Sequence, residues 1–218
     1  MAKVQQTTTI IDLFFHERQA YASGFRCVAG IDEAGRGPLA GPVVAACVVL
    51  SQEDQIDGVA DSKALTAAKR EALHTQIVAR AVGYGVAIVD HETIDRINIL
   101  QATLLAMRLA HANLLDKICP DLVLIDGNTL PKIVNVQQRA IIGGDGLSAS
   151  IAAASILAKV TRDRLMIEAA KTYPQYGFDS HKGYGCAQHL TALREHGPCP
   201  LHRRSFSPVS QTALQFPE

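Results

Sequence analysis

The feature that most constrains the fold is a set of short apolar runs that lead directly into acidic residues. Leu122-Val123-Leu124-Ile125 precedes Asp126, and an apolar run over residues 27–31 precedes Asp32. Continuous apolar runs of about four to eight residues are typical of strands that are buried on both faces of a sheet. A third run, over residues 43–50, predicts a buried strand that pairs with the strand at residues 27–31.

Helical patterns accompany these strands. Apolar residues recur at spacings of three, four or seven between Ile97 and Ile118, which predicts an amphipathic helix that Pro120 ends. The other expected elements are a short helix or arm at residues 10–21, a helix at 66–80, a strand at 84–89, one more strand from 133–136 and 139–142, a helix from 151 to about 171 capped by Ser148 or Ser150, a loop at 177–185 and a helix at 187–196. We therefore expect an α/β fold, a mixed β-sheet flanked by helices with a small helical C-terminal appendage.

The chain has 218 residues, of which 48% are hydrophobic, enough for one full-sized core. We expect an N-terminal arm or helix at residues 1–26, a main domain at 27–208 whose appendage starts at about 172, and a flexible tail at 209–218. No run approaches the ~20 apolar residues that span a bilayer, and the N-terminus lacks a signal-peptide pattern. We therefore expect a soluble, cytoplasmic monomer without membrane contacts.

The charge distribution is uneven although the formal net charge is +0. Residues 159–204 contain eight Lys and Arg residues against four acids, so the C-terminal quarter is basic. A neutral total can therefore hide an acidic metal site beside a basic groove. The five cysteines include no Cys-x-x-Cys pair, which argues against a disulfide framework or a structural zinc site.

Acidic residues follow the predicted strands, where sites form in open α/β sheets. Asp32 and Asp126 each end an apolar run, and Asp145 follows a Gly-Gly turn. Burying such an acid is costly unless it is paired or binds a cation. Asp126 and Asp145 could also be simple turn residues. Asp32 and Glu33 can both reach one site only if the strand ends or bulges there, because successive strand side chains point to opposite faces.

These acids are hard oxygen ligands, and the eight histidines show no metal-ligand spacing. Oxygen-only ligation favours Mg²⁺ or Mn²⁺ over Zn²⁺. Three or four carboxylates carry enough charge for two such ions, which at ~3.5–4 Å apart can activate a water and stabilise the leaving oxygen of a phosphodiester. The residues thus predict metal-assisted cleavage of nucleic acid.

Seven motifs, in order over residues 27–208, carry a family resemblance. They are Ile31-Asp32-Glu33-Ala34-Gly35-Arg36-Gly37 within residues 28–43, Asp61-Ser62-Lys63, Asp126-Gly127-Asn128 after its strand, residues 150–163, Tyr176-Gly177-Phe178, His181-Lys182-Gly183-Tyr184 and His202-Arg203-Arg204-Ser205-Phe206. With these motifs the chain resembles bacterial type 2 ribonuclease H, the ribonuclease HII family.

The resemblance implies a ribonuclease H-like fold and a Mn²⁺- or Mg²⁺-dependent endonuclease. Its substrate would be the RNA strand of RNA–DNA hybrids, including ribonucleotides embedded in duplex DNA, with 3′-hydroxyl and 5′-phosphate products and a role in ribonucleotide excision repair. The implied catalytic acids are Asp32, Glu33 and Asp126 as metal ligands and Asp145 as an assisting group. Relatives often carry a lysine where this chain has Gly144, so Asp145 lies in an unusually glycine-rich loop.

The resemblance also implies substrate contacts. They are Gly35, Arg36 and Gly37 with the ribose 2′-hydroxyl, Tyr184 with the sugar that follows the ribonucleotide, and Lys63 and Lys182 with phosphates. The 2′-hydroxyl is the group that distinguishes RNA from DNA. Taken alone, these residues could be a plain turn, a loop anchor and surface lysines. Arg203 and Arg204 could contact phosphate or hold the tail.

The C-terminal segment Gln211-Thr212-Ala213-Leu214-Gln215-Phe216 matches the Gln-x-x-Leu-x-Phe pattern of peptides that dock on bacterial sliding clamps. A random end of the chain without a docking role is the alternative.

Three other functions of the protein also remain open: a non-catalytic nucleic-acid-binding domain, an enzyme acting on a small phosphorylated ligand, and a junction resolvase of the same fold. Metal-dependent cleavage of a duplex at a ribonucleotide would separate them.

Overall fold

The computed structural model describes residues 12–59 and 65–213, and it confirms the expected α/β fold. A mixed sheet has the strand order β3-β2-β1-β4-β5. The strands are β1 Val28–Ala34, β2 Val43–Val49, β3 Gly83–Val89, β4 Leu122–Asp126 and β5 Gln137–Ile141. The helices are α1 Phe15–Ala22, α2 Ala67–Arg80, α3 His91–Leu115, α4 Ala149–Thr172, α5 Phe178–His181, α6 Ala187–His196 and α7 Val209–Ala213, with 3₁₀ helices η1 Gly144–Gly146 and η2 Pro174–Tyr176.

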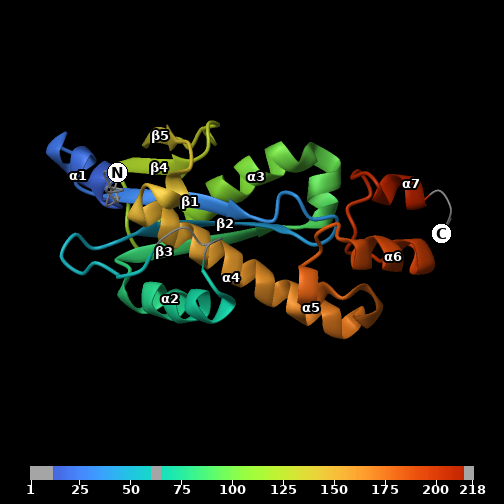
Figure 1. The fold of residues 1–218 in the computed structure, drawn as a ribbon. Coiled ribbons are helices and arrows are strands. Elements are labelled where there is room, and N and C mark those ends of the chain that lie inside the picture. Colours follow the sequence, from blue (N-terminus) through green and yellow to red (C-terminus); the bar gives the residue numbers. More distant parts are fainter. Residues whose placement is uncertain (1–11, 60–64, 214–218) are drawn as a thin grey trace, which may run out of the picture.

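Helices cover both faces of the sheet. The odd-numbered residues of β2 pack into one core with α3, and the even-numbered residues pack into a second core with α2 and α4. Every residue of β2 is buried, which explains its unbroken apolar run. Figure 1 shows α3 on one side of the sheet, α2 and α4 on the other, and α5 to α7 beyond one end. No helix of the described residues has the length and apolar character to cross a membrane.

The central strand β1 continues through both of its acids. Its antiparallel ladder with β2 is regular from Gly30 to Ala34, so the prediction that the strand ends or bulges at Asp32 is wrong. The parallel ladder between β1 and β4 ends earlier, at the pair Ile31 and Ile125. Beyond that pair the two strands separate, and the last residues of β1 have a free edge toward β4.

Three elements differ from the sequence-based expectation. Helix α3 begins at His91 and is interrupted at Asn98, whose positive φ of 65° breaks the helix and whose side chain accepts a bond from the Gln101 amide at 3.1 Å. The expected loop at 177–185 contains the short helix α5, anchored by the fully buried Phe178. The extra strand is β5 alone, and residues 133–136 form no strand.

The start of α4 is tied to α1. Ser148 is the N-cap, since its side chain accepts from the Ile151 amide. The hydroxyls of Ser148 and Ser150 each donate to Oε1 of Glu17 at 2.6 Å, and the Ser150 amide donates to the same oxygen at 3.0 Å. Glu17 is only 3% exposed. A carboxylate at a helix N-terminus also interacts favourably with the helix dipole.

Candidate functional site

A pocket of about 230 Å³ opens where β1 and β4 separate. It is lined by ten residues: Asp32, Glu33, Ala34, Gly35, Arg36, Gly37, Asp126, Ser155, Lys159 and Tyr184. Seven of these are the residues predicted to bind metal or to contact the ribose. The structure therefore brings together side chains from β1, β4, α4 and the segment after α5.

Asp32 and Glu33 reach this pocket from opposite faces of β1. Asp32 is 4% exposed and accepts a hydrogen bond from Ser155 of α4. Its Oδ1 also accepts from the amide of Glu33 at 2.7 Å. Glu33 lies on the α3 side, where it also lines a smaller cavity with Thr103 and forms an ion pair of 3.2 Å with Arg36. The free edge of β1 explains how both neighbours line one pocket without a bulge.

Asp126 ends β4 and is held by the glycine-rich loop that follows β5. Its Oδ1 accepts a bond of 2.7 Å from the amide of Gly144. A Cβ at Gly144 would lie 2.6 Å from Ile151 Cδ1, so a larger residue there requires Ile151 to move. The next residue, Asp145, is buried at 7% exposure and does not line the pocket.

The electrostatics of the pocket favour a bound cation. Burial raises the pKa of Asp32 well above its usual range, and repulsion from Glu33 and Asp126 adds to this shift. Burial also raises the pKa of Glu33, while Arg36 acts in the opposite direction. A cation among the three carboxylates would offset both the desolvation and the repulsion.

The donor set suits a hard divalent ion, because it consists of carboxylate oxygens. As the side chains stand, no group of three or more acid, His or Cys residues within the described residues is arranged to hold a metal ion. The reason is local: Glu33 is turned toward Arg36, and one oxygen of Asp126 is bonded to Gly144. The carboxylate chemistry of the pocket therefore fits a divalent ion.

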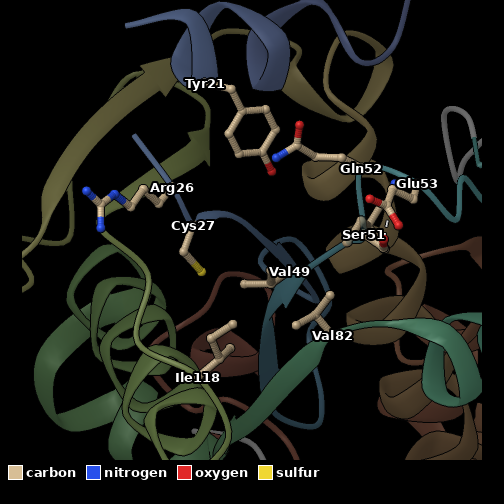
Figure 2. Close-up of a pocket in the computed structure, with 10 residues that line it drawn as sticks. Tyr21, Arg26, Cys27, Val49, Ser51, Gln52, Glu53, Val82 and Ile118 are labelled. Carbon is tan, nitrogen blue, oxygen red and sulfur yellow. Dashed lines mark hydrogen bonds between the residues drawn. The ribbon is translucent and has the colours of Figure 1, made fainter. Parts of the chain in front are cut away.

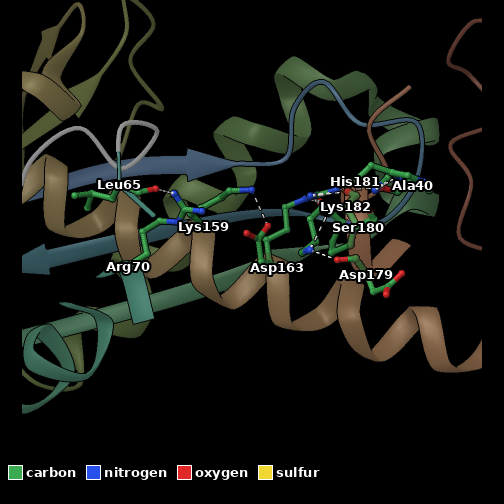
Figure 3. Close-up of polar contacts among 12 residues, drawn as sticks. Ala40, Leu65, Arg70, Lys159, Asp163, Asp179, Ser180, His181 and Lys182 are labelled. Atoms are coloured by element: carbon green, nitrogen blue, oxygen red, sulfur yellow. Dashed lines mark hydrogen bonds and ion pairs between the residues drawn. The ribbon is translucent and has the colours of Figure 1, made fainter. Parts of the chain in front are cut away.

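The other three lining residues are Ala34, Ser155 and Lys159, and the two polar ones, Ser155 and Lys159, were not among the predicted site residues. Lys159 forms an ion pair of 2.7 Å with Asp163 (Figure 3). Residues four apart on a helix share one face, and both lie in the 150–163 motif. That spacing, together with a predicted helix beside the acids, was the available signal.

Of the two predicted phosphate contacts, Lys182 does not line this pocket. Lys63 lies outside the described residues. Lys182 lines a neighbouring cavity together with Lys159, and its Nζ donates to the carbonyls of Asp179 and Ser180 (Figure 3). Arg203 is fully buried and bonded to backbone carbonyls, so it has no surface to offer a phosphate.

Another cavity, of about 370 Å³, lies away from these residues and is lined by Tyr21 of α1, Val49 of β2 and the segments at 26–27, 50–53, 82 and 118 (Figure 2). Its polar groups include Tyr21, Arg26, Cys27 and Glu53, and none of the predicted site residues that the structure describes lines it. Burial raises the pKa of Cys27 to about 11, so its thiol is a weak nucleophile at neutral pH. This cavity is not the predicted site.

Comparison with known proteins identifies the family. A sequence model of the family described as ribonuclease HII matches residues 29–209. The chain is 54% identical over 209 residues to a ribonuclease HII of Endomicrobium trichonymphae, covering 94% of this chain and 99% of that protein. The ribonuclease H2 structure from Pyrococcus horikoshii OT3 aligns with a TM-score of 0.73 and 28% identity, over 88% of this chain and 99% of that one. A chain of the PCNA–ribonuclease HII complex from Archaeoglobus fulgidus aligns with a TM-score of 0.71 and 27% identity, over 84% and 96%. The chain therefore belongs to the ribonuclease HII family, whose members are ribonuclease H enzymes and thus hydrolases.

Proposed function

We propose that this protein is an endonuclease that hydrolyses the RNA strand of RNA–DNA hybrids, including single ribonucleotides embedded in duplex DNA. The products carry 3′-hydroxyl and 5′-phosphate ends. The observation that supports this proposal best is the gathering of three carboxylates with Gly35, Arg36, Gly37 and Tyr184 around one pocket. Residues 27–208 are the catalytic unit in this proposal.

Asp32, Glu33 and Asp126 would hold the divalent ions, Mn²⁺ or Mg²⁺, and Asp145 would assist. When bound, such ions lower the pKa of a water and stabilise charge on the leaving oxygen. Ser155 orients Asp32, and the Gly144 amide orients Asp126. Glu33 leaves Arg36 to join the ligands, which frees the half-exposed Arg36 side chain for the substrate.

Recognition of the ribose uses the two walls of the pocket. A Cβ at Gly37 would lie 3.6 Å from the Tyr184 ring, so the glycine segment and the tyrosine face each other closely. Tyr184 is 46% exposed and can pack against a sugar. Lys63 and Lys182 contact backbone phosphates, which positions the duplex without reading its sequence.

Cleavage of a defined duplex tests this function. The substrate is duplex DNA with one embedded ribonucleotide, and the control is the same duplex made entirely of DNA. We expect cutting at the ribonucleotide with Mn²⁺ or Mg²⁺, and loss of cutting in Asp126→Asn, which retains the shape of the side chain but not its charge.

Three results would contradict the proposal. Absence of cutting with both ions would indicate a binding domain. Equal cutting of the all-DNA duplex would indicate a nuclease without ribose recognition, such as a resolvase. Hydrolysis of a small phosphorylated compound without action on duplexes would indicate the third alternative.

Docking on a sliding clamp is a second proposed function. The A. fulgidus relative was solved as a complex with PCNA, and residues 211–216 match a clamp-docking pattern. Residues 214–218 lie outside the described part of the chain, while α7 ends at Ala213.

The double variant Leu214→Ala, Phe216→Ala leaves the sequence of α7 unaltered and should abolish binding to a bacterial clamp in a surface-binding assay. Equal binding by the variant, or no binding by the wild type, would exclude this function.

A further inference from the structure

Two arginines behind the pocket are fully buried. Arg203 is 0% exposed and Arg162 is 1% exposed, and among the described residues neither forms an ion pair with a carboxylate. Their hydrogen bonds go to backbone carbonyls instead. Burying two cations without acidic partners is costly, and a core that only needed filling would use apolar side chains.

Arg203 holds both ends of the loop between β1 and β2. Its Nη1 donates to the carbonyl of Arg36 at 2.9 Å, and its Nη2 donates to that of Gly35 at 2.6 Å. Toward the other end of the loop, Nε donates to Gly41 at 2.9 Å and Nη2 also reaches Pro42 at 3.2 Å. One guanidinium therefore fixes the backbone of the segment proposed to recognise the 2′-hydroxyl.

Arg162, on α4, joins the same loop to the segment that carries Tyr184. Its Nε donates to Pro42 at 2.9 Å and its Nη2 to Ala40 at 3.1 Å, while its Nη1 donates to the carbonyl of Lys182 at 3.0 Å. The two walls of the pocket thus share one guanidinium. A Cβ at Gly35 would lie 2.1 Å from Nε of Arg162, so the arginine occupies the space that a larger residue would need.

The chemistry of arginine explains this choice. The guanidinium is planar and carries five N–H donors in a fixed geometry, so bonding several carbonyls sets their separations. Burial lowers the pKa of Arg203 to about 9 and also lowers the pKa of Arg162. Guanidinium groups nevertheless stay protonated in proteins, so both side chains carry their charge. The carbonyl dipoles provide the compensation that carboxylates would otherwise give.

We propose that Arg162 and Arg203 are positioning residues that hold the Gly35-Arg36-Gly37 segment and Tyr184 at the separation that fits one ribose. Neither arginine touches the substrate. They act through the backbone carbonyls of loop 35–42 and of Lys182, and so determine how well a ribonucleotide is recognised. This inference rests on the proposed function.

Arg203→Lys and Arg162→Lys test the inference, because lysine keeps the charge but cannot bond several carbonyls in one plane. The substrate is duplex DNA with one ribonucleotide, and the all-DNA duplex is used as a competitive inhibitor. We expect kcat/KM to fall about 10- to 100-fold with a rise in KM, as for a displaced substrate-positioning group. The inhibition constant of the all-DNA duplex should stay unchanged, since its binding does not use the 2′-hydroxyl.

Two control variants separate positioning from general loss of structure. Arg80→Lys makes the same change on α2, where Arg80 pairs with Asp54, and should leave all constants unchanged. Leu73→Ala removes a buried side chain between α2 and α4 and lowers Tm without touching the loop. A partly unfolded enzyme loses apparent kcat but keeps its KM, so Leu73→Ala should not raise KM.

The inference is overturned if the arginine variants keep the wild-type KM, or if the inhibition constant of the all-DNA duplex rises in parallel with KM. It is also overturned if neither variant folds, because the arginines would then serve the whole domain rather than the site. A wild-type enzyme that does not cut at the ribonucleotide refutes the proposed function itself, which is a distinguishable result.

Discussion

At the scale of single residues, the candidate site depends on side chains that stand behind the carboxylates. Ser155 bonds to Asp32 and thereby favours its ionised form, against the effect of burial on the pKa. One helical turn later, Lys159 lines the same pocket and is held by Asp163. Helix α4 thus presents a hydroxyl and a cation to the acids on the sheet.

We predict that Ser155→Ala lowers kcat by about 10-fold or more, as is typical when a group that orients a metal ligand is removed. The affinity for Mn²⁺, measured by calorimetric titration, should fall as well, because Asp32 loses a bond to its charged form. Ser23→Ala, at an exposed position after α1, is the control. Unchanged kcat and unchanged Mn²⁺ affinity would show that Ser155 plays no part in orienting Asp32.

The sequence indicates some of these residues and not others, for physical reasons. Asp32 and Asp126 stand out because an acid after an apolar strand is costly without a purpose. The motif includes Arg203 but does not predict its burial, since an arginine near the end of a chain is ordinarily exposed. Only the tertiary contacts reveal that it is buried. The reason for Gly144 is equally hidden, because it depends on the distance to Ile151.

At the scale of secondary-structure elements, the contact between α1 and α4 links the N-terminal arm to the loop that carries Asp145. Three donors from Ser148 and Ser150 converge on one oxygen of Glu17. The 3₁₀ helix η1 ends two residues before Ser148, whose amide donates to the carbonyl of Gly144. Glu17 therefore stabilises the start of α4 and, through it, the glycine-rich loop.

We predict that Glu17→Ala lowers the free energy of unfolding by about 2–4 kcal/mol, since hydrogen bonds to a charged group contribute about 1.5–3 kcal/mol each and do not add fully. Urea denaturation followed by circular dichroism measures this change. Glu195→Ala, on the exposed side of α6, serves as the matched control and should change stability little. If both variants unfold at the same urea concentration, Glu17 is not an anchor.

Elements with one dominant pattern could be predicted from the sequence. The helix expected at 187–196 is α6, and the apolar run at 43–50 is β2. A helix buried on one face shows a regular apolar spacing, and a strand buried on both faces shows a continuous apolar run. The break at Asn98 could not be predicted, since a residue with φ of 65° leaves the apolar spacing intact. The path of β1 past Asp32 also depends on where β4 separates from it.

At the scale of the whole molecule, the C-terminal appendage is joined to the site by a chain of neutral histidines. The Cys199 amide donates to Nδ1 of His202 at 3.0 Å, so Nε2 of His202 carries the proton and donates to Nε2 of His189 at 3.0 Å. Nδ1 of His189 then donates to the carbonyl of Tyr184 at 3.0 Å. Every donor in this chain has an acceptor only while both rings are neutral.

Protonation would disrupt this chain, and the environment opposes it. Burial lowers the pKa of His202 from 6.5 to about 4, and repulsion from His189 adds to the effect. Burial also lowers the pKa of His189. The titratable groups around His202 are His189 on α6, Cys199, Tyr176 of η2 and His91 at the start of α3, while His181 stacks on His189.

We predict that the protein loses stability as the pH falls from about 6.5 to 4. In this window the unfolded chain binds a proton at residue 202 and the folded chain does not, so protons favour unfolding. The stabilisation is fully present above pH 6.5, and the loss reaches about 3 kcal/mol at most by pH 4. Urea denaturation at a series of pH values measures the slope of the unfolding free energy against pH.

His202→Gln should flatten this slope, whereas His196→Gln, an exposed change on the same appendage, should not. A slope that is equal in all three proteins would mean that the appendage does not respond to acid through His202.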